Sequence, residues 1–244
     1  GPQFEMKSYF SQRSISYRLY LTKLLSFRCL GHLDFMRMIE MSLRRSGLPL
    51  QQTSGYIPHL KISSAPALPL GVGAFESWVE FYTYKPLEEL FPSISDLIMI
   101  LRKSFPVGIK PLKIERAGKG FSAENSHYCS LWRLKIKRKS PRILGHFEEN
   151  RDVITYDGNL RIDEIKQKLG ESLQYHISNN GKEVFYFTLP EGSSPLKVLK
   201  IFTENYDDKS FTNSHWEIQD LSLVKHIVPE TFNPPVFAIP KALI

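Results

Sequence analysis

The residue types best suited to chemistry are concentrated between positions 28 and 73. His32 and Asp34 stand at the start of an expected helix, and His59 lies in a loop rich in proline and serine. A histidine can give or take a proton near neutral pH, so His32 and His59 could meet across a site as an acid/base pair. A simpler alternative stays open, because Asp34 suits the first turn of any helix and a histidine beside it can merely pack.

The loop around residue 57 combines rigid and reactive residues. Gly55 permits backbone conformations closed to other residues, and Pro58 fixes the backbone ahead of His59. In such a loop Tyr56 could stack on a base, Lys61 could contact a phosphate and the histidine could donate a hydrogen bond. The alternative is a tight connection whose histidine only binds a backbone carbonyl.

A second group of candidate residues lies on one expected strand in the second half of the chain. Its cations alternate with apolar residues, and a period of two places them all on one face. Unpaired burial of a charge is costly, so these side chains must face solvent or an anion. We interpret the row as a phosphate-binding face; the alternative is a solvated edge strand kept soluble by lysine. The four cations are Arg133, Lys135, Lys137 and Lys139. A third group follows on the first helix, off its apolar stripe: Arg37, Arg44 and Arg45.

Composition and charge agree with a polyanionic partner. The chain has 32 Lys and Arg against 25 Asp and Glu, a net charge of +7, and a pI near 9.3. Such a balance favours RNA, although a mildly basic protein without a nucleic-acid partner fits it too. No apolar run approaches the roughly 18 residues of a membrane span, and no signal peptide is visible. With only two cysteines, we expect a reduced, cytoplasmic location and no membrane partner.

Metal and cofactor binding are not expected. Cys29-x-x-His32 and His127-x-Cys129 could together supply two sulfurs and two nitrogens, but zinc sites usually show two clean paired motifs. No three-cysteine cluster is present for an iron–sulfur centre, and residues 71–73 lack the lysine of a phosphate loop.

Apolar periodicity predicts an α+β protein built from two similar halves. We predict two tandem ferredoxin-like (βαββαβ) halves with antiparallel sheets. The expected domains are 3–116, a linker at 117–127, 128–228, and a Pro-rich tail at 229–244. Expected strands are 17–25, 48–53, 78–84, 109–116, 131–139, 174–178, 184–189 and 216–228. Expected helices are 32–46, one capped by Ser95, 160–173, and one from Ser194 to about 206. The first helix carries a stripe of Leu33, Phe35, Met36, Ile39 and Leu43. Asn179-Asn180-Gly181 predicts a hairpin turn.

Two blocks of the first half resemble a known bacterial family. One block reads Gly31-His32-Leu33-Asp34 and, at the end of the helix, Arg44-Arg45-Ser46-Gly47-Leu48-Pro49. The other reads Thr53-Ser54-Gly55-Tyr56-Ile57-Pro58-His59-Leu60-Lys61-Ile62-Ser63, then Pro69-Leu70-Gly71-Val72. Both resemble the radical SAM-linked protein family, a domain usually encoded beside, or fused to, a radical SAM protein. Ile57, Leu60 and Cys29 depart from the family's pattern. The resemblance implies a radical SAM partner and names no reaction.

Together these features predict a non-catalytic RNA-binding module that presents tRNA or rRNA to a modifying or processing enzyme. One alternative is a metal-independent endoribonuclease, similar at fold level to CRISPR repeat-processing enzymes, that would use His32, His59 and Lys61. The glycine-rich C-terminal loop of those enzymes is missing. Another alternative is a protein-interaction subunit that docks through the Pro-rich tail and the aromatic strand 78–84.

Overall fold

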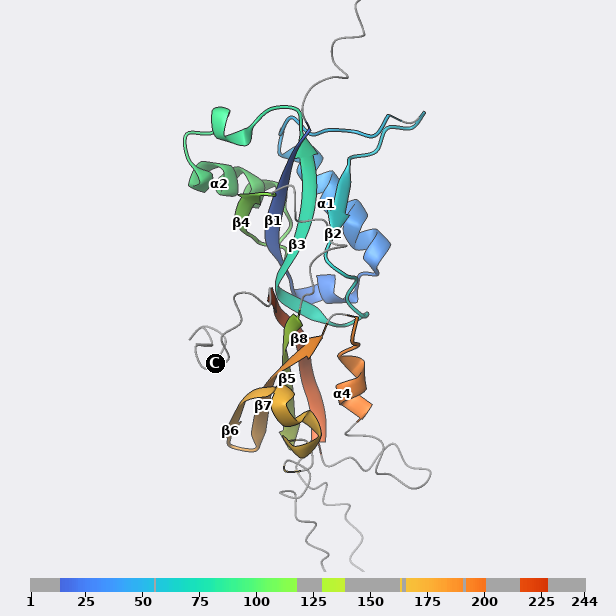
Figure 1. The fold of residues 1–244 in the computed structure, drawn as a ribbon, viewed down its shortest axis with the longest axis vertical. Helices are drawn as coiled ribbons and strands as arrows, with labels where there is room; N and C mark the ends of the chain where they lie inside the picture. Colours follow the sequence, from blue (N-terminus) through green and yellow to red (C-terminus); the bar gives the residue numbers. More distant parts are fainter. Residues whose placement is uncertain are drawn as a thin grey trace, which may run out of the picture. The chain divides into compact units, whose positions relative to one another are not determined.

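The chain forms two compact units, residues 1–126 and 127–244. The computed structural model describes residues 14–54, 56–117, 129–138, 163, 166–190, 192–200 and 216–227. Both units mix helices with strands, and every strand pair within each unit is antiparallel, which confirms the α+β class (Figure 1). No helix in these described ranges is long and apolar enough to cross a membrane.

The first unit alternates strands and helices. Its elements are β1 (Ile15–Lys23), α1 (His32–Arg45), β2 (Ile62–Ser64), β3 (Gly73–Thr83), α2 (Ile94–Ser104) and β4 (Pro111–Arg116). Two 3-10 turns, η2 (Leu25–Cys29) and η3 (Leu87–Glu89), lie in the connections. The strand order across the sheet is β4-β1-β3-β2. The first and last strands in sequence are therefore neighbours.

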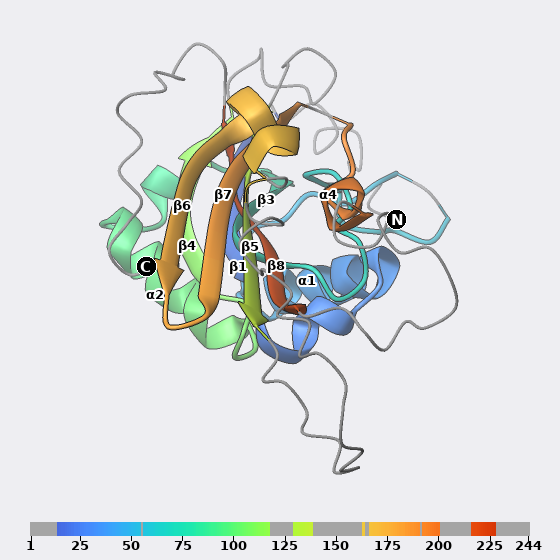
Figure 2. The same cartoon turned by 90° about the horizontal axis from the view of Figure 1, so that it is seen from below.

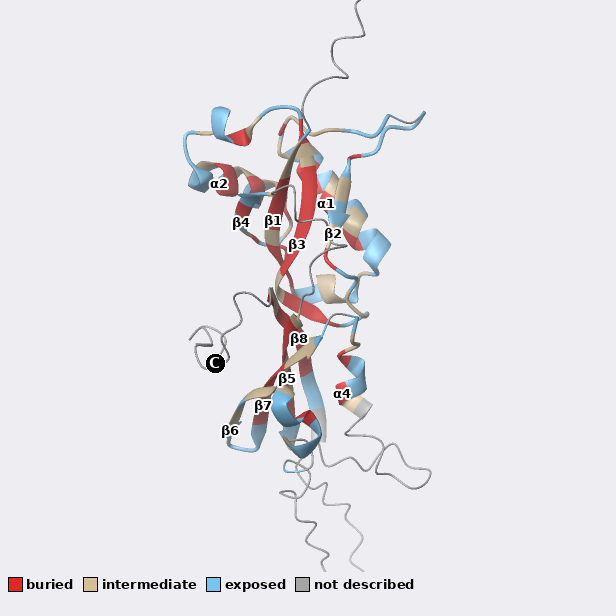
Figure 3. Cartoon of the chain, in the orientation of Figure 1, coloured by how far each residue is buried: buried red, intermediate tan, exposed pale blue. Residues whose placement is uncertain are grey.

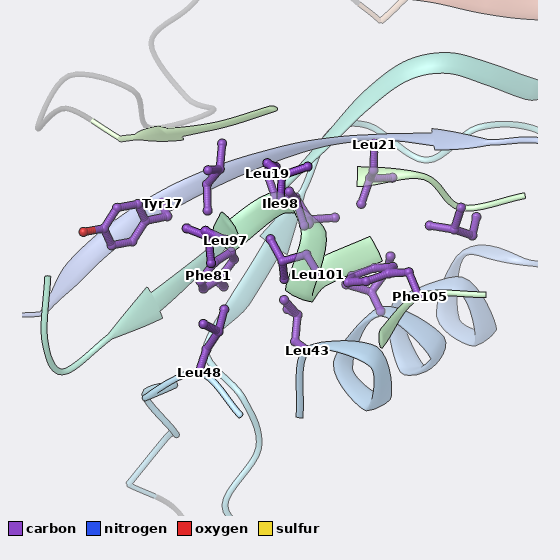
Figure 4. Close-up of a cluster of buried hydrophobic side chains, with 14 of the residues drawn as sticks. Tyr17, Leu19, Leu21, Leu43, Leu48, Phe81, Leu97, Ile98, Leu101 and Phe105 are labelled. Atoms are coloured by element: carbon purple, nitrogen blue, oxygen red, sulfur yellow. The ribbon is translucent and has the colours of Figure 1, made fainter. Parts of the chain in front are cut away.

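The core of the first unit lies between one face of its sheet and both helices. The alternation of β1 turns Tyr17, Leu19 and Leu21 to the same face, where they are buried. Helices α1 and α2 lie on that face and contribute Leu43 and Leu101, among others (Figures 2 and 4). Figure 3 shows the resulting burial along β1 and β3. The opposite face of β1 carries Arg18, Tyr20 and Thr22.

Three expectations for the first unit were wrong. Residues 48–53 form only isolated bridges, because Leu50 pairs with Thr83 and Gln52 pairs with Leu60, so neither partner continues along the segment. Helix α2 is capped by Ser93, whose Oγ accepts a hydrogen bond from Asp96 N at 3.2 Å, instead of by the serine two positions later. Leu33 is 72% exposed, since it lies about 120° round α1 from the buried Ile39.

The second unit contains four described strands. They are β5 (Cys129–Arg138), β6 (Leu173–Asn179), β7 (Lys182–Pro190) and β8 (Trp216–Ile227), in the order β8-β5-β7-β6. Residues 166–169 are helical and lead into the 3-10 turn η4 (Gly170–Ser172), and α4 spans Leu196–Lys200. The predicted hairpin turn is confirmed: Asn180 and Gly181 both have positive φ, 48° and 71°, as a two-residue type I′ turn requires.

Some predicted segments lie outside the described residues. These are residues 118–127 of the expected linker, the helix beyond residue 200, and the Pro-rich tail 229–244.

Candidate functional site

A small cavity lies where β1 ends and α1 begins. Lys23, the last residue of β1, lines it together with His32 and Phe35 from the first turn of α1. Ser77 and Trp78 of β3 and the segment 64–68 complete the wall. The volume is about 20 Å³, enough for one water-sized group. The cavity therefore includes His32 of the first sequence block and the residues 64–68 that connect the two parts of the second block.

Lys23 is the most unusual residue of this cavity, and the sequence reasoning missed it. Its residue surface is only 3% exposed, and its Nζ donates to the carbonyl oxygen of Leu30 at 3.0 Å. The ammonium lies 5.1 Å from the ring centroid of Phe35. Burial lowers the pKa of Lys23, and the nearby Cys29 acts in the opposite direction. Alternation gave no signal for it, because the register of β1 shifts between Leu21 and Lys23 and Thr22 is buried as well.

The segment beside the cavity is held by a reciprocal pair of hydrogen bonds. Arg28 Nε donates to the Gly71 carbonyl oxygen at 3.0 Å, and Gly71 N donates to the Arg28 carbonyl oxygen at 2.9 Å. Gly71 has φ of 82°, a conformation that favours glycine. A Cβ at Gly73 would lie 3.1 Å from the Lys23 carbonyl oxygen, so the chain passes close to the end of β1. Gly71 and Gly73 thus allow this segment to lie close to the end of β1, beside the cavity.

The Tyr56 loop, residues 53–59, projects from the unit on a hydrogen-bonded base. Thr53 N donates to the His59 carbonyl oxygen at 2.8 Å, and His59 N donates to Thr53 Oγ1 at 3.1 Å. Beyond this base Tyr56 is fully exposed, at 103%, and Ile57 is 67% exposed. Gly55 lies outside the described residues. The loop presents an aromatic ring and an aliphatic side chain to solvent.

The base of the Tyr56 loop is fixed to α1. Leu60 is buried in the core, and its N–H donates to Glu40 Oε1 at 3.4 Å, while Arg44 Nη2 donates to the same oxygen at 2.8 Å. Burial acts to raise the pKa of Glu40, but these two hydrogen bonds, together with the electrostatic effect of Arg44 and His59, outweigh burial and lower the pKa. Lys61 Nζ lies 4.3 Å from the ring centroid of Tyr82. The loop is therefore anchored on two sides.

His32 and His59 lie at different places along α1. His32 is the first residue of the helix and lines the cavity, whereas His59 acts electrostatically on Glu40. Eight positions of α1 correspond to about 12 Å along its axis. Lys61 lies beside the loop, over Tyr82. These three residues are therefore spread along the helix, and the acid/base pairing stays a prediction.

The three arginines of α1 have different partners. Arg37 Nη1 lies 3.3 Å from Asp34 Oδ1 in an exposed pair, and Arg44 pairs with Glu40. Arg45 Nη2 donates to the Ser104 carbonyl oxygen at 3.1 Å, at the last residue of α2. Arg45 thus joins the two helices, and Arg37 is the arginine of this group best placed to reach a phosphate.

The β5 cations share one face, but their surroundings differ. Arg133 Nη2 lies 2.6 Å from Asp220 Oδ2, and the side chains are only 17% and 10% exposed. Lys135 is half-buried and stands opposite the same aspartate, whereas Lys137 is exposed and stands opposite Lys182 on β7 and Glu217 on β8. Lys139 lies outside the described residues. Arg133 therefore faces an anion within the chain, and the exposed charge gathers toward Lys137.

Metal ligands do not gather in the described part of the chain. No group of three or more His, Cys, Asp and Glu side chains is arranged there to hold an ion. Cys29 is exposed and His127 lies outside the described residues.

Comparison with known proteins identifies a family. Residues 16–178 match the family described as an uncharacterized protein conserved in bacteria (DUF2344), and this match covers more than half of the 244 residues. No curated protein matches the chain. The chain belongs to the DUF2344 family. The expected association with radical SAM proteins stays a prediction.

Proposed function

We propose that this member of the DUF2344 family is a non-catalytic RNA-binding module that presents tRNA or rRNA to a modifying or processing enzyme. A radical SAM protein is the partner that the sequence resemblance suggests. The observation that carries the proposal is the fully exposed Tyr56 at the end of a loop anchored on α1.

An aromatic ring in this position suits an unpaired base. Stacking of one base on an aromatic side chain contributes about 1–3 kcal/mol, largely independent of sequence. The hydrogen bonds between Thr53 and His59 hold the base of the loop in place before any ligand arrives. Binding therefore costs less ordering entropy than it would in an unanchored loop. Ile57 adds apolar surface beside the ring.

Cations near the loop would supply the phosphate contacts. Lys61 stands immediately after it, and Arg37 is exposed on α1. In the second unit, considered by itself, Lys137 stands opposite Lys182 on one side and Glu217 on the other, so this strand end offers less net positive charge. Each phosphate contact adds to the salt dependence of RNA affinity.

The two units support a ferredoxin-like plan as part of the proposal. In each unit the strands, numbered along the chain, take the order fourth, first, third, second. RNA-binding sheets of this kind often use the face opposite the helices. In the first unit that face carries the buried Arg18 and Glu80. We therefore assign the main contact to the Tyr56 loop.

The endoribonuclease alternative requires His32, His59 and Lys61 around one phosphodiester. Their spread along α1 favours binding over cleavage. Incubation with small RNA in EDTA separates the two: discrete cleavage that disappears in His59→Ala would support the enzyme.

The decisive experiment measures RNA affinity by fluorescence anisotropy over a range of salt concentrations. Tyr56→Ala should weaken binding of a labelled tRNA about 5- to 100-fold while leaving the salt dependence unchanged, because stacking involves no ion release. Tyr84→Ala is the matched control, since this tyrosine is 38% exposed outside the loop. Equal affinity of the Tyr56→Ala variant and the unmodified chain would reject the loop as the contact. No binding at low salt would reject the function.

A further inference from the structure

We propose that the cavity beside Lys23 binds one oxyanion group, a phosphate or a carboxylate, while the rest of the ligand stays outside. This site is independent of the RNA-binding proposal, because it lies at the first turn of α1, about two turns from the Glu40 anchor of the Tyr56 loop.

Lys23 is a buried charge without a counter-ion among the described residues. Lys23 is 3% exposed, yet it forms no ion pair with any residue in the described ranges. Its one hydrogen-bond acceptor there is the Leu30 carbonyl oxygen. An ammonium can donate three hydrogen bonds, so two remain for a ligand. A buried charge without a counter-ion is costly, and an anion in the cavity would offset that cost.

The side chains that line the cavity suit an anion. Its polar side chains are those of Lys23, His32, Ser64 and Ser77, and none of them is a carboxylate. Ser64 Oγ already donates to the Ala65 carbonyl oxygen at 2.9 Å. The imidazole of His32 and the hydroxyl of Ser77 make no hydrogen bond within the described residues, so both are open to a ligand. Such a lining favours anions over cations.

The N-terminus of α1 leaves backbone N–H groups without acceptors in the described chain. The N-cap Gly31 has no side chain to accept a hydrogen bond, and the first bond inside the helix runs from Phe35 N to the Gly31 carbonyl oxygen at 3.0 Å. The backbone N–H groups of residues 32–34 therefore keep no acceptor within the described chain. A helix N-terminus attracts anions, and here it adds to the charge of a buried lysine.

The size of the cavity limits the ligand. About 20 Å³ holds one small group, so a phosphate or carboxylate would enter by its oxygens. Both groups present oxygens to N–H donors in the same way, and the shared chemistry defines the site.

Thermal unfolding in inorganic phosphate, with chloride at matched ionic strength as reference, tests the site. The melting temperature of the unmodified chain should rise with phosphate concentration and then saturate. Lys23→Met should abolish the rise. Lys113→Met, which loses the same charge from the exposed surface of β4, should retain it. A chain without a saturable rise, or a Lys23→Met variant with the full rise, would overturn the proposal.

A second pair of variants covers the case in which Lys23→Met does not fold. His32→Gln and Ser77→Ala each remove one predicted ligand contact and should weaken phosphate binding at least threefold in calorimetry. Unchanged affinity in both would overturn the proposal. Titrations with acetate, and with a dinucleotide with and without a 5′-phosphate, then distinguish the source. Tighter binding of acetate points to a carboxylate, and tighter binding of the phosphorylated dinucleotide points to a terminal phosphate.

Discussion

Strand β1 carries two buried cations that differ in their partners. Arg18 faces away from the helices, donates two hydrogen bonds to Glu80 at 2.7 and 3.0 Å, and lies 4.1 Å from the ring centroid of Trp78. Lys23, five positions later, lies over the Phe35 ring of α1, and its one hydrogen-bond acceptor within the described residues is the Leu30 carbonyl oxygen. Both residues are less than 5% exposed. Burial is thus the same, and only the partners differ.

The difference separates a structural cation from a binding cation. The charge of Arg18 is matched within the sheet, so the pair fixes the register of β1 against β3. The charge of Lys23 is unmatched in the described chain and lines a cavity. A protein can tolerate such a residue when a ligand supplies the missing charge. This contrast leads to four predictions.

The largest effect is expected for Glu80→Gln. It weakens the two hydrogen bonds that the buried guanidinium of Arg18 donates to a carboxylate, which should lower the free energy of unfolding by about 3–5 kcal/mol. Urea denaturation of the full chain measures the loss. Glu89→Gln, which removes an exposed carboxylate of the same unit outside the sheet, should change stability by less than about 0.5 kcal/mol. Similar values for the two variants would show that the buried pair is not structural.

A smaller loss is expected for Asp220→Asn in the second unit. It removes the partner of Arg133, but that side chain is 17% exposed and can reach water, so we expect about 1–3 kcal/mol. Hydrogen exchange of the β5 and β8 amides should show the loss locally. Glu171→Gln, at an exposed position of the same unit, is the control. A loss equal to that of Glu80→Gln would mean that the exposed fraction of an ion pair does not determine how much the pair stabilises the fold.

Lys23→Met should change stability by no more than about 1 kcal/mol. The substitution loses one hydrogen bond and a cation–π contact, but it also removes a buried charge that lacks a counter-ion. Urea denaturation in phosphate-free buffer measures the change. A loss above about 3 kcal/mol would show that Lys23 is a structural cation like Arg18, and the contrast would fail.

The sequence predicted most elements because their patterns are local. β1 and β7 alternate over many residues, and Asn180-Gly181 has the chemistry of its turn. β2 was missed because Ile62-Ser63-Ser64 is too short and too polar to show a pattern. Residues 48–53 were assigned to a strand because their apolar content resembles one, although the chain there bridges only at single points.

The site was harder to predict, because it depends on pairing between distant segments. The Tyr56 loop stood out by composition, and its anchor at Glu40 follows only from the folded arrangement. Lys23 at the end of a strand resembles a solvated residue until the segment 64–68 is placed beside it. Likewise, no local pattern reveals that Arg133 lies beside Asp220.

The smallest effect is expected at the base of the Tyr56 loop on acidification. The pKa of Glu40 is held below its ordinary 4.5, so the unfolded chain binds this proton at a higher pH than the folded chain. The stabilisation is therefore complete above pH 4.5 and is lost as pH falls through the lower folded pKa. Amide signals of Leu60 and His59 should shift in that window in a pH titration by NMR, because protonation weakens the bonds to Arg44 and Leu60 N. Glu40→Gln should remove the titration and leave the loop equally mobile at all pH values. Unchanged amide signals down to pH 3 would show that Glu40 does not anchor the loop.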